Sequence, residues 1–130
     1  MYRVLLGGLA LFAVLTAHAD DSTAYYKGTC LVYNNGDGTE IARKDFDVTK
    51  GQDEEVWSNG GLVFYVGQTQ ALFPDNSVKY QLDVRIAYNN NTLAQSISDF
   101  DPNKGASVVL VGPKKIAGMK VPMMTCEEWP

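Results

Sequence analysis

The stretch Val78–Tyr88 alternates regularly between apolar and polar side chains. The apolar set occupies every even-numbered position: Val78, Tyr80, Leu82, Val84, Ile86 and Tyr88. A β-strand turns successive side chains to opposite faces, so this spacing predicts a strand with one apolar face and one solvated face. A second layer must cover the apolar face. We therefore expect Leu82 and Val84 in a core between two layers, and Gln81 and Asp83 on the solvent side.

Several other short runs are rich in β-branched and aromatic residues and are bounded by Gly, Asn and Asp turn signals. These runs lie at residues 29–33, 39–48, 62–70, 92–98, 106–111 and 119–123. Residues 92–98 also fit helical spacing, but a hairpin strand is the simpler interpretation, and residues 71–77 are predicted to form a loop. Pro122 removes a backbone donor from the last run, which favours an edge position. Roughly seven to nine short strands predict an all-β fold, a small antiparallel β-sandwich, with a barrel as the alternative.

Residues 1–19 have the features of a secretory signal peptide. A short basic start at Arg3 precedes an almost purely apolar run over residues 4–15, and Ala17-His18-Ala19 supplies small residues where signal peptidase reads the chain. The apolar run is shorter than the ~20 residues of a membrane-spanning helix, which weighs against an uncleaved anchor. Cleavage after Ala19 leaves residues 20–130 as a single β-sandwich domain, predicted to be periplasmic or secreted.

The two cysteines, Cys30 and Cys126, lie near the two ends of this domain. An even number of cysteines in an exported chain predicts a disulfide. The chain has no Cys-x-x-Cys motif and no histidine near either cysteine, so a pair of reactive thiols is the less favoured alternative. Closing so long a loop stabilises a fold by about 4 kcal/mol in the chain-entropy model.

The charge of the chain argues against some classes of partner. The sequence carries 11 basic and 15 acidic residues, which gives a formal net charge of −4 at pH 7. Affinity for nucleic acid depends on Lys and Arg neutralising phosphates, so we expect no nucleic-acid partner. No stretch after residue 19 is apolar enough to insert stably into a membrane. The only basic cluster is Lys114, Lys115 and Lys120, which fits a solvated strand edge as well as a binding patch.

The single histidine, His18, lies within the predicted signal peptide. Residues 20–130 therefore contain no imidazole general base, no Ser-His-Asp triad and no Cys-His pair. Zinc, copper and haem sites usually need histidine or several cysteines. We expect no enzymatic activity, no metal and no cofactor, and hydrolysis by a pair of carboxylates stays open as the alternative.

One segment resembles the start of a calcium loop, because Asp99, Asp101 and Asn103 occupy alternate positions. The pattern departs from an EF-hand in two ways. Gly105 comes one residue late, and Leu110 stands where a bidentate glutamate is needed. A turn explains the segment better, so these three residues stay a calcium candidate of second rank.

Three aromatic residues, Trp57, Tyr65 and Trp129, are candidates for contacts with a partner, because aromatic faces stack on sugars or anchor proteins. The competing interpretation is that they plug the open ends of the sandwich. The leading hypothesis is an exported, non-catalytic module that binds a protein partner, for example as an inhibitor of an extracellular or envelope enzyme. The alternatives are a structural or accessory subunit of a surface assembly, joined by strand addition, and a carbohydrate- or calcium-dependent binder.

Overall fold

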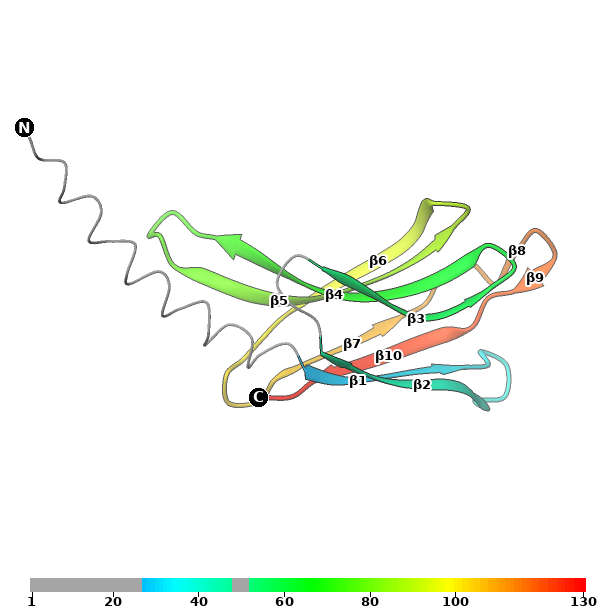
Figure 1. The fold of residues 1–130 in the computed structure, drawn as a ribbon, viewed down its shortest axis with the longest axis horizontal. Coiled ribbons are helices and arrows are strands. Elements are labelled where there is room, and N and C mark those ends of the chain that lie inside the picture. The colour runs from blue at the N-terminus through cyan, green and yellow to red at the C-terminus, as the bar shows by residue number, and fades with distance from the viewer. Residues whose placement is uncertain (1–26, 48–51) are drawn as a thin grey trace, which may run out of the picture.

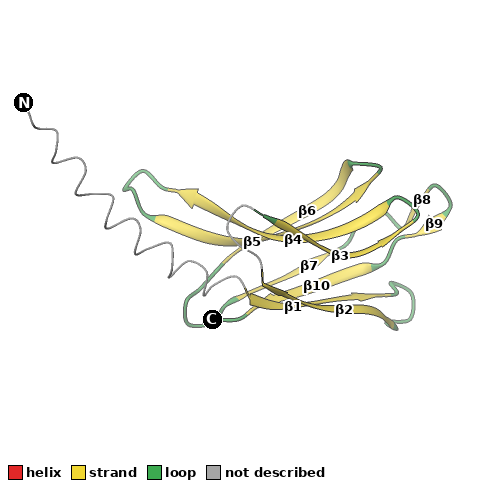
Figure 2. Ribbon diagram, viewed as in Figure 1, coloured by secondary structure: helices red, strands yellow, loops and turns green. Residues whose placement is uncertain are grey.

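The computed structural model describes residues 27–47 and 52–130, so the predicted signal peptide, residues 1–19, lies outside the described residues. Two four-stranded antiparallel sheets pack face to face, and a separate pair of short strands lies at one end (Figure 1). The described residues form strands joined by turns and loops, and they contain no helix (Figure 2). The predicted all-β sandwich is confirmed. Within the part of the chain that the structure describes, no helix is long and apolar enough to cross a membrane.

Sheet A contains the first and last strands of the domain as its two central members. Its order is β2-β1-β10-β7, with bounds Glu40–Asp47, Lys27–Tyr33, Met123–Glu128 and Ala106–Leu110. Cys30 and Cys126 stand directly opposite each other in the β1–β10 ladder, with 4.1 Å between their Cα atoms, and they form a disulfide. Both cysteines are buried in the core, and the bond joins positions 96 residues apart. The predicted disulfide is confirmed.

Sheet B is a meander in which every strand pairs with its neighbour in the sequence. Its strands are β3 (Asp53–Asn59), β4 (Leu62–Leu72), β5 (Val78–Tyr88) and β6 (Asn91–Asp99). Gly60-Gly61 and Asn89-Asn90 both have positive φ angles, as two-residue type I′ hairpin turns require. The hairpin interpretation of residues 92–98 is thus confirmed by β6.

The strand predicted from alternation, β5, lies between β4 and β6 with its even-numbered face toward sheet A. Leu82, Val84 and Ile86 are at most 1% exposed, whereas Gln81 and Asp83 are partly exposed on the outer face. The predicted register is therefore correct through the centre of the strand. Val78 differs, since it belongs to the same face but is 47% exposed.

The prediction of an edge position for the last strand is wrong. The run expected at residues 119–123 is broken, because β9 (Met119–Lys120) pairs with β8 (Lys115–Ile116) and β10 starts only at Met123. Pro122 therefore lies just before β10, where its missing N–H costs no ladder hydrogen bond, and β10 is central in sheet A. With this small hairpin the described strands number ten, eight of them in the sandwich.

Candidate protein-binding site

The β4–β5 hairpin is longer than the strands on either side of it. Among the described residues, β4 pairs with β3 only as far as Gly67, and β5 pairs with β6 only from Gln81 onward. Beyond these points β4 and β5 continue to pair with each other, ending at Leu72 opposite Val78. Residues 70–80, here called the hairpin tip, therefore project as a two-stranded ribbon beyond the two sheets (Figure 1). The loop predicted at residues 71–77 is shorter, because the ladder occupies part of it.

The hairpin tip exposes three large apolar side chains close together. Leu72 is 71% exposed, Phe73 37% and Val78 47%, and Leu72 and Val78 are direct ladder partners. Single exposed hydrophobic residues are normal on protein surfaces. A contiguous group on a projecting element is typical of an interaction site.

The turn at the tip is fixed by hydrogen bonds. The Phe73 amide donates to the Ser77 carbonyl at 2.9 Å, and the Asn76 amide donates to the Phe73 carbonyl at 2.8 Å. Asp75 Oδ1 accepts from the Ser77 hydroxyl at 2.6 Å and from the Ser77 amide at 2.9 Å, and these bonds lower the pKa of the Asp75 carboxyl. A turn held in this way loses little conformational entropy when a partner binds it.

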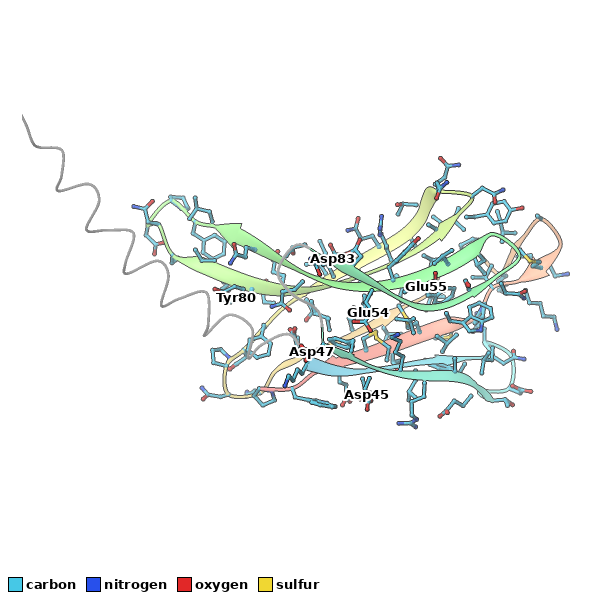
Figure 3. All side chains as sticks on the ribbon, viewed as in Figure 1. Asp45, Asp47, Glu54, Glu55, Tyr80 and Asp83 are labelled. Carbon is cyan, nitrogen blue, oxygen red and sulfur yellow. A yellow bond between two sulfur atoms is a disulfide. The ribbon has the colours of Figure 1, made fainter. Side chains whose placement is uncertain are left out.

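The base of the hairpin tip is tied to β6 through Asp99. Asp99 Oδ1 accepts from Gln81 Nε2 at 2.9 Å, and Asp99 Oδ2 lies 3.2 Å from Lys79 Nζ. The hydrogen bonds from Gln81 and Lys79, with the positive charge of Lys79, hold the pKa of Asp99 below its usual value. Lys79 Nζ also lies 5.5 Å from the ring centroid of Phe73, within cation–π range. Tyr80, labelled in Figure 3, lies at the base of the hairpin tip, where its carbonyl accepts from the Phe100 amide at 2.9 Å and its side chain packs against the core.

The other members of the calcium candidate point elsewhere. Asp101 Oδ1 accepts from the Asn103 amide at 2.8 Å, and backbone hydrogen bonds between Asp101 and Gly105 close a turn in which Gly105 has a φ of 83°. The turn predicted for this segment is present. Across residues 27–47 and 52–130, no group of three or more His, Cys, Asp or Glu side chains is arranged to hold a metal ion.

Two of the aromatic candidates lie away from the hairpin tip. A bulge between Glu55 and Trp57 shifts the register of β3. The ring of Trp57 packs edge-on against the ring of Phe64, with 5.5 Å between the ring centroids, so Trp57 borders the core. Tyr65 lies on the outer face of sheet B, where the guanidinium carbon of Arg85 is 4.6 Å from the centroid of its ring.

Trp129, the third aromatic candidate, is 46% exposed beside a hollow of about 430 Å³ near the C-terminus. The hollow is lined by residues 104–107 and 127–130. One of them, Glu128, is only 2% exposed, and desolvation raises the pKa of its carboxyl to about 8.

The residues of the hairpin tip were missed by sequence reasoning, which placed Leu72 and Phe73 in a loop. The available signal was a pair of large apolar residues directly before Pro74-Asp75-Asn76, because such residues in a turn have no core to enter. The tip offers apolar surface, and its charged groups, Asp75 and Lys79, are already engaged. No protein-family model, curated protein or solved structure matches the chain.

Proposed function

We propose that this protein is a non-catalytic binding module that recognises a protein partner by burying its hairpin tip in an apolar cleft of that partner. Inhibition of an extracellular or envelope enzyme is the concrete version of this function. The observation that carries the proposal is the group of exposed apolar side chains, Leu72, Phe73 and Val78, on a projecting and hydrogen-bonded hairpin.

The energetics of such a contact are favourable. Burying a Leu, Val or Phe side chain contributes roughly 1.5–3 kcal/mol relative to leaving it exposed. Part of that gain offsets the loss of translational and rotational freedom on association, and a turn that is already ordered adds little to the cost. The apolar tip is therefore the region in which we expect the residues that dominate binding energy.

The proposed location is the periplasm or the extracellular space. The Cys30–Cys126 disulfide is compatible with an oxidising compartment, where such bonds form and persist. The intact mass of the protein recovered from periplasm or medium tests this part of the proposal. A chain that begins at Asp20 supports export, and a chain that retains residues 1–19 contradicts signal cleavage.

Site-specific cross-linking tests the binding proposal. A photoreactive amino acid in place of Leu72 is expected to capture a discrete protein from the native envelope or secretome, and the captured protein is then purified for affinity measurements. Leu72→Asp and Phe73→Ser are expected to weaken its binding by at least about tenfold, since each removes more than 1.4 kcal/mol of apolar contact.

The matched control is Val109→Asp, because Val109 is 53% exposed and lies on β7 of sheet A, away from the hairpin tip. This variant is expected to bind the partner with unchanged affinity. Unchanged affinity in both tip variants would reject the hairpin tip as the binding site.

Two specific observations favour other functions. The edges of both sheets, β2 and β7 in sheet A and β3 and β6 in sheet B, suit strand addition in a surface assembly. Concentration-dependent association in analytical ultracentrifugation would support that alternative. The hollow beside Trp129 suits stacking on a sugar ring. Sugar-array binding that is lost in Trp129→Ala would support a carbohydrate binder.

A further inference from the structure

A second hollow lies at the end of the sandwich opposite the hairpin tip. The β1–β2 loop and the β8–β9 hairpin lie together at this end (Figure 1). The hollow has a volume of about 390 Å³ and is lined by three lysines and an Asn-Asn-Gly turn: Lys114, Lys115, Lys120, Asn34, Asn35 and Gly36. We call it the lysine hollow. Its volume lies within the usual range for small-ligand sites.

The lysine hollow contains a pair of like charges within one strand ladder. Lys115 and Lys120 are direct partners in the β8–β9 ladder, which has only two pairs. Like charges directly opposite each other destabilise a ladder. All three lysines are exposed, and β8 and β9 are the two edge strands of a separate sheet, so the interpretation as a solvated strand edge also fits their positions.

The lysines of the hollow also differ from most other cations in the described part of the chain. Lys27, Arg43, Lys44, Lys79 and Arg85 each have a carboxylate as an ion-pair partner. The described residues supply no ion-pair partner for Lys114, Lys115 or Lys120. Hydrogen bonds from Thr39 are the main cause that lowers the pKa of the Asp37 carboxyl, and the charge of Lys120 is the smallest of the contributions.

The rim of the hollow is held in place by backbone hydrogen bonds. The Asn34 amide donates to the Thr39 carbonyl at 2.8 Å, and the Gly38 amide donates to the Asn34 carbonyl at 2.9 Å. On the other side, the Val121 amide donates to the Lys114 carbonyl at 3.0 Å. The lysines therefore extend from a fixed frame in a chain that is acidic as a whole.

We propose that the lysine hollow binds a small multivalent anion that carries two or more phosphate or carboxylate groups. Such an anion neutralises the repulsion between Lys115 and Lys120 and brings Lys114 into the same cluster of charges. Lysine binds these groups as a point charge, without the planar geometry that arginine requires. The asparagine side chains beside the lysines offer further N–H donors to the oxygens of the ligand.

Titration of the ¹⁵N-labelled protein with sodium pyrophosphate, at constant ionic strength, tests the proposal. We expect saturable chemical-shift changes at residues 34–36 and 114–121, a rise in Tm, and slower hydrogen exchange at the Val121 amide. Parallel titrations with citrate and with acetate separate phosphate from carboxylate ligands and multivalent from single charges. Saturation by pyrophosphate or citrate but not by acetate supports a multivalent anion.

The variant Lys115→Gln/Lys120→Gln is expected to weaken binding by at least about tenfold, because each lost charge-assisted hydrogen bond contributes more than a factor of ten. Without anion, its Tm is expected to equal or exceed that of the wild type, because the repulsion is gone. The control Lys27→Gln/Lys104→Gln changes the net charge equally away from the hollow and is expected to bind within about twofold, since salt screens distant charges. No saturable change in the wild type, or an equal loss in the control, would overturn the proposal.

Discussion

Leu62 and Leu72 stand at the two ends of β4, yet their side chains are 1% and 71% exposed. Around Leu62 the strand has β3 on one side and β5 on the other, and sheet A covers its inner face. Around Leu72 only β5 pairs with β4 among the described strands. The same residue type in the same strand is thus core at one end and a candidate contact at the other. Burial here is decided by how far the neighbouring elements extend.

The largest expected effect comes from truncating the two leucines separately. Leu62→Ala is expected to lower the free energy of unfolding by about 2–5 kcal/mol, because it removes buried methyl groups and leaves a cavity. Leu72→Ala is expected to change it by no more than about 0.5 kcal/mol, as is usual for surface positions. Urea unfolding of both variants measures the difference. Similar losses in both would mean that the hairpin tip is covered and that the contrast between the two ends of β4 is wrong.

The next effect concerns two polar side chains that are buried. Gln68 on β4 and Glu128 on β10 are both buried, at 1% and 2% exposure. Desolvation raises the pKa of the Glu128 carboxyl to about 8 in the folded state, from an ordinary value of 4.5. Between these two values the unfolded chain binds fewer protons than the folded protein, so stability falls as pH rises.

This group is therefore expected to make stability decline by at most about 1.4 kcal/mol per pH unit from about pH 4.5 to about pH 8, with no further contribution above that. Glu128→Gln keeps the shape but removes the ionisation, so its stability is expected to be flatter over the same range. Thermal unfolding in a pH series compares the two proteins. Equal slopes would show that Glu128 does not cause the pH dependence.

The smallest effect is expected where β3 stops pairing with β4. Asp53 and Gly67 are ladder partners, and a Cβ at Gly67 would collide with Asp53 Oδ1. Because Gly67 has no side chain, the Asp53 carboxylate can cross β4, where its Oδ2 lies 2.7 Å from Arg85 Nη2. A double-mutant cycle with Asp53→Asn and Arg85→Gln is expected to give a coupling of roughly 0.2–1 kcal/mol that decreases with salt, because both side chains are partly exposed. A coupling that does not respond to salt would argue against an ion pair.

Alternation in the sequence predicted which residues of β5 share a face, and the cysteine count predicted the disulfide. The exposure of Val78 was not predictable in the same way, because a period of two residues does not reveal whether another sheet lies opposite. Leu72 was assigned to the loop because it stands close to the turn signal Pro74-Asp75-Asn76, whereas it ends β4, and the loop assignment of Phe73 is correct. The edge position predicted from Pro122 was wrong, because a missing N–H excludes a ladder hydrogen bond at that one residue. It does not show whether the strand that follows is central or at an edge. The lysine hollow brings residues 34–36 next to residues 114–120, which are far apart in the sequence. The sequence therefore showed the cluster of three lysines but not the hollow.

The central position of β1 and β10 in sheet A has a consequence for the order in which the protein folds. The hairpins of sheet B need only residues close together in the sequence, so we expect them to form early. β1 is made first, but its partner in the middle of the sheet, Met123–Glu128, is made almost last, because synthesis proceeds from the N-terminus. During chain growth β1 has β2 alone beside it. Sheet A closes, and Cys30 meets Cys126, only when the final strand has emerged.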